Sequence, residues 1–385
     1  MNNKFNLKQV RRSAIAVAVG MCFASMAYAQ NADGTIFGRA KAKESVQVVN
    51  TETGASRTIE ADKDGSFTFT KLPVGRYKVT TGGKTREVSV AIGSGTEVKF
   101  DDVATVTVTA SRTRNPIDVS STESNTVFSL AEIQALPVGR NATAVSLLAP
   151  GTVAGDAAFG NLASFSGASV AENGYYINGF DVTNMRNFTN YASLPFDAIS
   201  QQQVKTGGYG AEFGRSLGGV VSLSTKRGTN TWKGGASVYV TPGWASAAGK
   251  TVINQDKDAW ITPDQPSYTL FSPTANTFKN LSYNVYAGGP IIKDKLFVFG
   301  LLEGRKNTSD TYGGATSGTS SAETPNGMMK LDWQISDDHR LEFTGISNKR
   351  RTSYATYDNV NDADKYALRH VGTPRLSSVD SGGDV

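Results

Sequence analysis

Apolar and polar positions alternate along the C-terminal part of the chain. This period-two pattern predicts five strands, at residues 231–241, 281–289, 296–305, 327–335 and 340–348. In the fourth strand, Met329, Leu331 and Trp333 share one face, opposite Lys330 and Asp332. One apolar face and one polar face suit a wall with lipid on one side and water on the other. A soluble β-sandwich would alternate in the same way, so the pattern alone leaves both architectures open.

The connections between these strands alternate in length. They cover residues 242–280, 290–295, 306–326 and 336–339, which reads long, short, long, short. Barrels of the bacterial outer membrane place long loops outside the cell and short turns in the periplasm. The loop lengths therefore favour the membrane wall over the soluble sandwich.

Residues 31–100 have the pattern of a small all-β domain. The strand Ser66–Thr70 alternates with period two, and the turn signals Asp62–Gly65 and Leu72–Gly75 flank it. Together with Thr53-Gly54 and Arg76-Tyr77, this run resembles a carboxypeptidase regulatory-like domain. The resemblance implies a seven-stranded, prealbumin-like sandwich without catalytic residues over 30–100.

The first 29 residues form a separate segment. Four Lys or Arg residues precede an apolar stretch from Ala14 to Met26. Ala27-Tyr28-Ala29 then gives the small-x-small pattern that signal peptidase cleaves, so we expect a signal peptide over 1–29. The alternative is an N-terminal helix or anchor, which is too short to span a bilayer well.

A β-prone strip with polar flanks covers residues 101–112, between two expected domains. Such a strip has unpaired backbone groups and can add as a strand to a partner sheet. It resembles the TonB box of bacterial outer-membrane receptors, which implies that it binds TonB through Thr105, Val106, Thr107, Val108 and Thr109. The plain alternative is a last strand or a linker.

Residues 113–230 combine short helices, strands and glycine-rich turns. Ser129 and Glu132 form a capping-box pattern ahead of Leu136-Pro137, and a second short helix is expected at Asn141–Leu148. The long run Val204–Lys226 resembles the plug domain of TonB-dependent receptors. Three shorter motifs resemble the Oar-like branch of that family, namely Leu136–Asn141, Tyr176–Gly179 and Lys226–Asn230.

The plug resemblance suggests candidate functional residues. Glu212 and Arg215 are three positions apart and could pair with barrel charges to lock the plug. The alternative is a local ion pair, which is worth little if exposed. The polar loop near the expected plug apex suggests ligand contacts through Asn184, Arg186, Asn187 and Tyr191.

Charge and apolar content narrow the class of protein. The chain of 385 residues has 39 Lys+Arg against 34 Asp+Glu, a net charge of +5. Loss of the expected signal removes four basic residues and no acid, which leaves +1. The basic balance therefore indicates no nucleic-acid partner. No later apolar run is long enough for a membrane-spanning helix, which excludes a helical membrane protein for the mature chain.

The sequence shows little sign of a catalytic site or a metal-binding site. The only cysteine, Cys22, falls in the expected signal, and His339 and His370 are the only histidines, so we expect no cofactor and no metal. Gly214–Gly218 fits the spacing of a nucleophile elbow around Ser216. An elbow needs a strand before the serine and a helix after it, whereas here a glycine-rich turn leads into a strand. We therefore expect no enzyme.

The sequence thus predicts a mostly β protein: the sandwich, an α+β plug over 113–230, and the first strands of an incomplete transmembrane barrel over 231–385. About 22 strands close a plugged barrel, yet 155 residues follow Asn230 and end in an expected polar loop at 377–385. We therefore expect an N-terminal fragment of a longer receptor.

The resemblance implies a receptor of the Gram-negative outer membrane that takes up or exports a large ligand by plug remodelling. The implied partners are the TonB complex, the lipid bilayer and an extracellular ligand, peptide, protein or glycan rather than siderophore. Two alternatives stay open. A β-rich surface adhesin or secretion component would not need the strip at 105–109, and a hydrolase would need Ser216.

Overall fold

The protein is described by a computed structural model. It describes residues 33–100, 124–156, 162–186, 188–189, 191–192, 194–247, 252–254, 268–271, 276–312, 316–336, 339–358 and 373–381. The expected signal peptide and the strip at 101–112 lie outside these residues. Within the described ranges, no helix is long and apolar enough to cross a membrane.

The N-terminal domain is a sandwich of two sheets. One sheet has the order β4-β1-β7, with β1 at Asp33–Arg39, β4 at Ser66–Pro73 and β7 at Gly95–Val98. The other has the order β3-β2-β5-β6, with β2 at Ser45–Asn50, β3 at Ser56–Glu60, β5 at Gly75–Thr81 and β6 at Lys84–Val90. Alternating residues such as Phe67, Phe69 and Val79 fill the core between the sheets. Seven strands in two layers agree with the expected sandwich; its regulatory-like family stays a prediction.

The plug domain is built on one five-stranded sheet of order β12-β11-β14-β13-β8. Its strands are β8 (Ser124–Ser129), β11 (Gly174–Ile177), β12 (Phe180–Asp181), β13 (Ile199–Gly207) and β14 (Val220–Thr225). The shorter elements are α2 (Leu130–Ala135), α3 (Ala142–Ser146), β9 (Thr152–Ala154), β10 (Ala163–Phe165), η3 (Val170–Glu172) and η4 (Phe196–Ala198). All residues of β11 and β14 are buried, so these two strands form the centre of the domain.

The caps of the two plug helices follow from the sequence. The Ser129 side chain accepts from the Glu132 amide, and the Glu132 carboxylate accepts from the Ser129 amide. Asn141 caps α3 by accepting from the Ala144 amide at 2.8 Å. Both caps satisfy amide groups that a helix N-terminus leaves without partners. The capping box at Ser129 was predicted, whereas for the second helix only the range Asn141–Leu148 was predicted.

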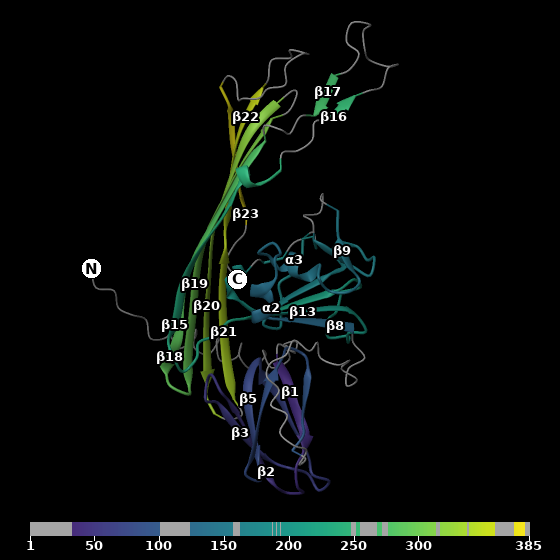
Figure 1. The fold of residues 1–385 in the computed structure, drawn as a ribbon, viewed down its shortest axis with the longest axis vertical. Helices are drawn as coiled ribbons and strands as arrows, with labels where there is room; N and C mark the ends of the chain where they lie inside the picture. The colour runs from purple at the N-terminus through teal and green to yellow at the C-terminus, as the bar shows by residue number, and fades with distance from the viewer. Residues whose placement is uncertain are drawn as a thin grey trace, which may run out of the picture.

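The C-terminal part is a seven-stranded antiparallel sheet that curves around one side of the plug (Figure 1). Its strands are β15 (Lys233–Pro242), β18 (Thr277–Ile292), β19 (Leu296–Tyr312), β20 (Thr316–Gln334), β21 (Arg340–Asn348), β22 (Arg350–Asp358) and β23 (Arg375–Ser381). Next to it are η5 (Gly243–Ala245) and a separate hairpin of β16 (Val252–Asn254) and β17 (Tyr268–Phe271).

Two of the loop predictions are wrong. Most of 306–326 is strand, because β19 and β20 stay paired up to Tyr312 and Ser317. The polar stretch 377–385 was expected as a loop, yet Ser377–Ser381 belong to β23 and pair with β22. Both stretches are polar on two faces and show no alternation. Backbone pairing alone holds them in the sheet, and hydrophobicity patterns do not report it.

The alternation within the sheet is as expected. Val238 in β15 and Val285 in β18 are more than half exposed on the outer face, as are Leu341 and Phe343 in β21. The opposite face turns toward the plug, and Lys330 there is 1% exposed. The apolar outer face suits contact with lipid, and the polar inner face suits contact with the plug.

Candidate functional site

The plug and the sheet share one hydrophobic core. Four inward side chains of the sheet, Phe299, Leu301, Met328 and Ile346, belong to the same cluster as the plug core. The plug contributes apolar side chains from its central strands, among them Ile177 and Leu223. Burial of this shared surface makes plug and wall a single packed unit.

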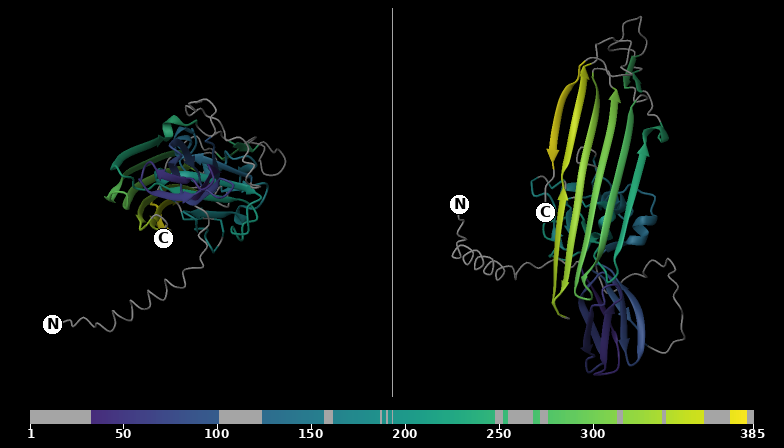
Figure 2. Two further views of the ribbon diagram at one scale, coloured as in Figure 1. Left: turned by 90° about the horizontal axis from the view of Figure 1, so that it is seen from below. Right: turned by 90° about the vertical axis from the view of Figure 1, so that its left-hand side faces the viewer.

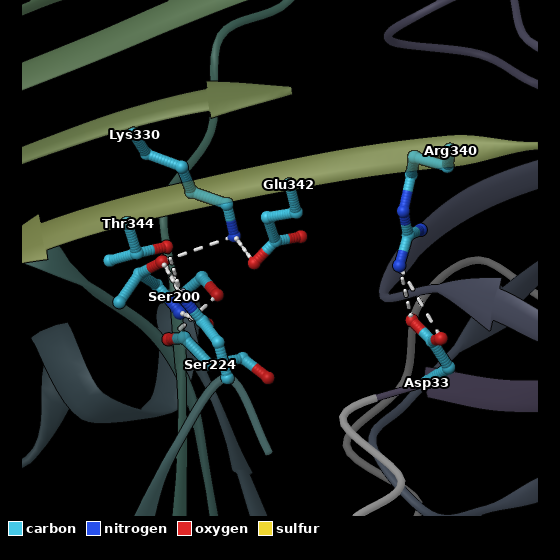
Figure 3. A network of polar contacts seen from close by, with 9 residues as sticks. Asp33, Ser200, Ser224, Lys330, Arg340, Glu342 and Thr344 are labelled. Carbon is cyan, nitrogen blue, oxygen red and sulfur yellow. Dashed lines mark hydrogen bonds and ion pairs between the residues drawn. The ribbon is translucent and has the colours of Figure 1, made fainter. Parts of the chain in front are cut away.

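A polar latch lies beside this core (Figure 3). Lys330 Nζ is 2.8 Å from Glu342 Oε1 and donates to Thr225 Oγ1 at 3.2 Å. Asn178 Nδ2 donates to Thr344 Oγ1 at 3.0 Å. These contacts join the ends of β11 and β14 to β20 and β21 of the wall. The ion pair itself joins two neighbouring wall strands and positions the Lys330 ammonium, which is 1% exposed, against Thr225 of the plug.

The conformation of Asn178 explains why an Asn-Gly pair ends β11. Asn178 has φ of 49° and Gly179 has φ of 84°, a left-handed turn that asparagine and glycine tolerate best. The Asn178 Oδ1 also accepts from the Thr225 amide at 3.0 Å. The turn thereby aims one side chain at both the neighbouring plug strand and the wall.

A second latch involves Arg140. Its Nη2 lies 2.6 Å from Asp197 Oδ1, and its guanidinium lies 3.7 Å from the ring centre of Tyr239 in β15. Asn284 of β18 donates to the other oxygen of Asp197. Arg140 thus pairs with a carboxylate of the plug and stacks on a ring of the wall, and lysine lacks the planar group for that stacking.

The segment after β14 is the junction between plug and wall. A side chain at Gly228 would lie 2.5 Å from the Val298 carbonyl oxygen, so only glycine fits there. The Asn230 side chain donates to Asp294 Oδ1 at 2.6 Å and accepts from the Asp294 amide at 2.9 Å. Burial lowers the pKa of Lys226, whose ammonium lies 5.2 Å from the ring centre of Tyr286.

Arg215 of the predicted gating pair contacts other residues of the plug. Arg215 Nη2 lies 2.6 Å from Asp181 Oδ2, and its guanidinium lies 5.4 Å from the Phe188 ring centre. The Glu212 carboxylate folds over Gly210 of its own loop. The two latches make polar contacts between plug and wall. A gating role for Glu212 and Arg215 stays a prediction.

The predicted ligand residues fall into two groups. Asn184 and Arg186 are exposed, and the Asn184 side chain accepts from the Arg186 amide at 2.9 Å. Tyr191 instead stacks on Tyr175 with ring centres 4.1 Å apart, and burial raises the pKa of both phenols. Asn187 lies outside the described residues. The geometry leaves Asn184 and Arg186 available at the surface and gives Tyr191 a packing contact.

The surroundings of Ser216 indicate a role in packing the plug loop. It is 9% exposed, its hydroxyl donates to the Gly219 carbonyl at 2.9 Å, and it lies 3.1 Å from the Tyr209 hydroxyl. The next element is a strand, not the helix that a nucleophile elbow requires.

Sequence reasoning missed the residues of both latches. Three latch residues of the plug lie in or beside the Oar-like motifs, which were quoted without roles: Arg140 in the first, Asn178 in the second and Thr225 next to the third. Asp197 lies in none of them. Those of the wall were visible as polar residues on the inward face of the predicted strands. The sequence could not supply the pairing of Asn178 with Thr344, which lies 166 positions further along the chain.

The sequence of this chain is similar to a known plug-domain family and to a known transporter. Residues 118–220 match the family model of the TonB-dependent Receptor Plug Domain. The chain is 27% identical over 317 residues to the TonB-dependent transporter Oar of Myxococcus xanthus, covering 75% of this chain and 28% of that protein. The chain therefore spans about a quarter of the length of this relative.

Two solved structures of outer-membrane proteins are among those that match part of this chain. The siderophore receptor PirA of Acinetobacter baumannii has a TM-score of 0.38 and 18% identity, with 64% of this chain and 34% of that chain covered. The outer membrane transporter YddB of Escherichia coli has a TM-score of 0.42 and 18% identity, with 62% and 37% covered.

The match of residues 118–220 to the plug family and the similarity to Oar together support a TonB-dependent receptor of the Oar-like kind. The plug domain packed on an amphipathic wall agrees with that class. Receptors of this class are proteins of the Gram-negative outer membrane, which agrees with the expected localisation.

Proposed function

We propose that this protein moves a large ligand across the outer membrane, driven by TonB. The observation that carries the proposal is the plug sheet latched to the inner, polar face of a lipid-facing wall. A plug packed on the wall and held in register by polar contacts closes the pore at rest, and force on the plug can remodel it. A surface adhesin would not need such a latched domain.

The energy input enters through residues 105–109, which lie outside the described residues. They immediately precede the plug in sequence, and the first plug strand, β8, is an edge strand. An extended segment that adds to a TonB sheet would transmit force along the chain to β8. The ligand is a peptide, protein or glycan that contacts Asn184 and Arg186; uptake and export both fit this mechanism.

The first test is equilibrium binding of the purified receptor to the periplasmic domain of TonB from the same organism. Val106→Pro removes a backbone donor and prevents strand pairing, so we expect at least a tenfold weaker Kd. Val106→Thr keeps the strand propensity and should bind within twofold. Ser120→Pro, in the same segment beyond the box, is the matched control and should bind as the parent does.

Two results would contradict the proposal. Equal binding of the Val106→Pro variant would mean that 105–109 is a linker. An absence of TonB binding by a correctly folded parent, found in the outer membrane, would favour the adhesin.

A further inference from the structure

The sandwich domain lies beneath both the plug and the wall (Figures 1 and 2). It is at the end of the sheet where strands are joined by short turns, the first of them between Ile292 and Leu296. The long connection that carries β16 and β17 is at the opposite end. Short turns of outer-membrane barrels face the periplasm, so the sandwich lies on the periplasmic side.

Contacts with both neighbours hold the sandwich there. Arg340 Nη2 lies 3.0 Å from Asp33 Oδ1 at the start of β1 (Figure 3). The Asn230 amide donates to the Glu52 carbonyl at 2.8 Å. The first contact reaches the wall, and the second reaches the junction that leaves the plug.

The contact with the plug sheet is made by two glutamines. Gln201 Oε1 accepts from the Ile92 amide at 3.1 Å, and Gln203 Nε2 donates to the Ile92 carbonyl at 3.1 Å. Ile92 is 1% exposed. Two side chains of β13 therefore satisfy both backbone groups of one buried residue in the β6–β7 connection, which fixes the orientation of the sandwich under the plug.

This interface differs in kind from the one between plug and wall. Within the described residues, the apolar clusters of the sandwich and of the plug share no member. Two cavities of about 290 and 650 Å³ lie along the contact, lined by charged side chains such as Arg227 and Asp332. A polar interface between domains separates more readily than a continuous apolar core.

Chain length decides where a pull on residues 105–109 arrives first. Four residues, 101–104, separate this strip from the sandwich, and fourteen, 110–123, separate it from β8. At about 3.5 Å for each extended residue, the tethers reach roughly 14 Å and 49 Å. The shorter tether tightens first, so force loads the sandwich before the plug.

We propose that the sandwich is a periplasmic lid. Docked, it covers the mouth beneath the plug, and a pull on the strip at 105–109 undocks it before the plug sheet is loaded. The inference rests on the proposed TonB-driven function. Its test therefore measures docking and release without TonB or ligand.

The docked state is tested with a disulfide. A Cβ at Gly54 would lie 3.2 Å from Asp294 Cγ, close to the separation that a disulfide needs. We expect Gly54→Cys with Asp294→Cys to close on oxidation in isolated outer membranes. Thr80→Cys with Thr85→Cys, whose hydroxyls lie 3.0 Å apart within the sandwich, is the positive control. Closure of the control pair alone would overturn the inference.

The glutamine contact is tested in the same membranes. Gln201→Ala with Gln203→Ala should slow closure of the 54–294 disulfide at least threefold. Gln202→Ala is the matched control and should leave closure unchanged, because Gln202 donates to Ala142 and Ser146 of α3 instead. Equal closure rates in the double variant would show that these side chains do not position the lid.

Release is tested by pulling single receptors in a lipid bilayer through a handle inserted between Ala104 and Thr105. The reduced cysteine pair should give a first rupture at low force, followed by unfolding of β8, and oxidation of the same molecules should abolish that first rupture. Identical traces in both states would overturn the lid. If the low-force first rupture is observed but the receptor does not bind TonB, the proposed function is refuted and the lid is not.

Discussion

The buried ion pair of the first latch provides the sharpest prediction about plug closure. Glu342→Gln removes the negative partner and leaves the Lys330 ammonium buried, 1% exposed, at the contact between plug and wall. The amide still fits the space and still accepts a hydrogen bond. The change therefore isolates the charge.

The expected magnitude follows from burial. Loss of one partner of a buried pair costs about 3–5 kcal/mol. Arg227 repels Lys330 and Asp332 attracts it, so the two neighbours act in opposite directions. We take about 3 kcal/mol, the smallest cost in that range. Since about 1.4 kcal/mol is a factor of ten, the closed plug should open roughly 100-fold more often.

Hydrogen exchange of β14 in detergent micelles measures this opening. Amides of Val220–Thr225 should exchange about 100-fold faster in the Glu342→Gln variant, while those of β5 in the sandwich should not change. Lys330→Met with Glu342→Leu removes both charges and should stay within about tenfold of the parent, because a buried pair is replaceable by apolar groups. Exchange within threefold of the parent in the single variant would refute the reasoning.

Three further changes test the geometry. Asn178→Ala should lower plug stability by about 1–3 kcal/mol, because it removes the wall contact and strains a residue with positive φ. Asn178→Gly should restore only the part of the loss that is due to φ. Hydrogen exchange of the β14 amides measures both variants. Gly219→Ala places a methyl 2.4 Å from Phe165 Cγ and should cost about 1–3 kcal/mol in chemical denaturation, whereas Gly207→Ala meets open space and should cost less. Val238→Arg puts a charge on the lipid face and should cost about 2–4 kcal/mol in folding titrations into vesicles, while Val238→Leu should be neutral.

The alternation of apolar and polar residues predicts those strands that have one apolar face and one polar face. The strand expected at 340–348 has these bounds in the structure as β21. Its continuation in β22 was missed, because Arg350–Asp358 is polar on both faces. Local chemistry also predicted the capping box at Ser129, because its side chain and that of Glu132 lie within three residues of each other.

The candidate site could be predicted only in part. The short motifs containing Arg140 and Asn178 were identified by resemblance, but their roles depend on partners far away in the chain. Arg215 looked like a latch residue because it is charged and lies in a glycine-rich loop. Its nearest acid proved to be Asp181, 34 positions earlier and within the plug. No spacing rule ranks such distant pairs.

The central claim is that TonB acts on this protein through residues 105–109, and photo-cross-linking in living cells tests it most directly. A photoreactive amino acid at Val106 should give an outer-membrane product that reacts with antibodies to both TonB and the sandwich, and the same group at Ser120 should not. Absence of a TonB product at every position from Thr105 to Thr109, in cells whose receptor is present in the outer membrane, would contradict the account.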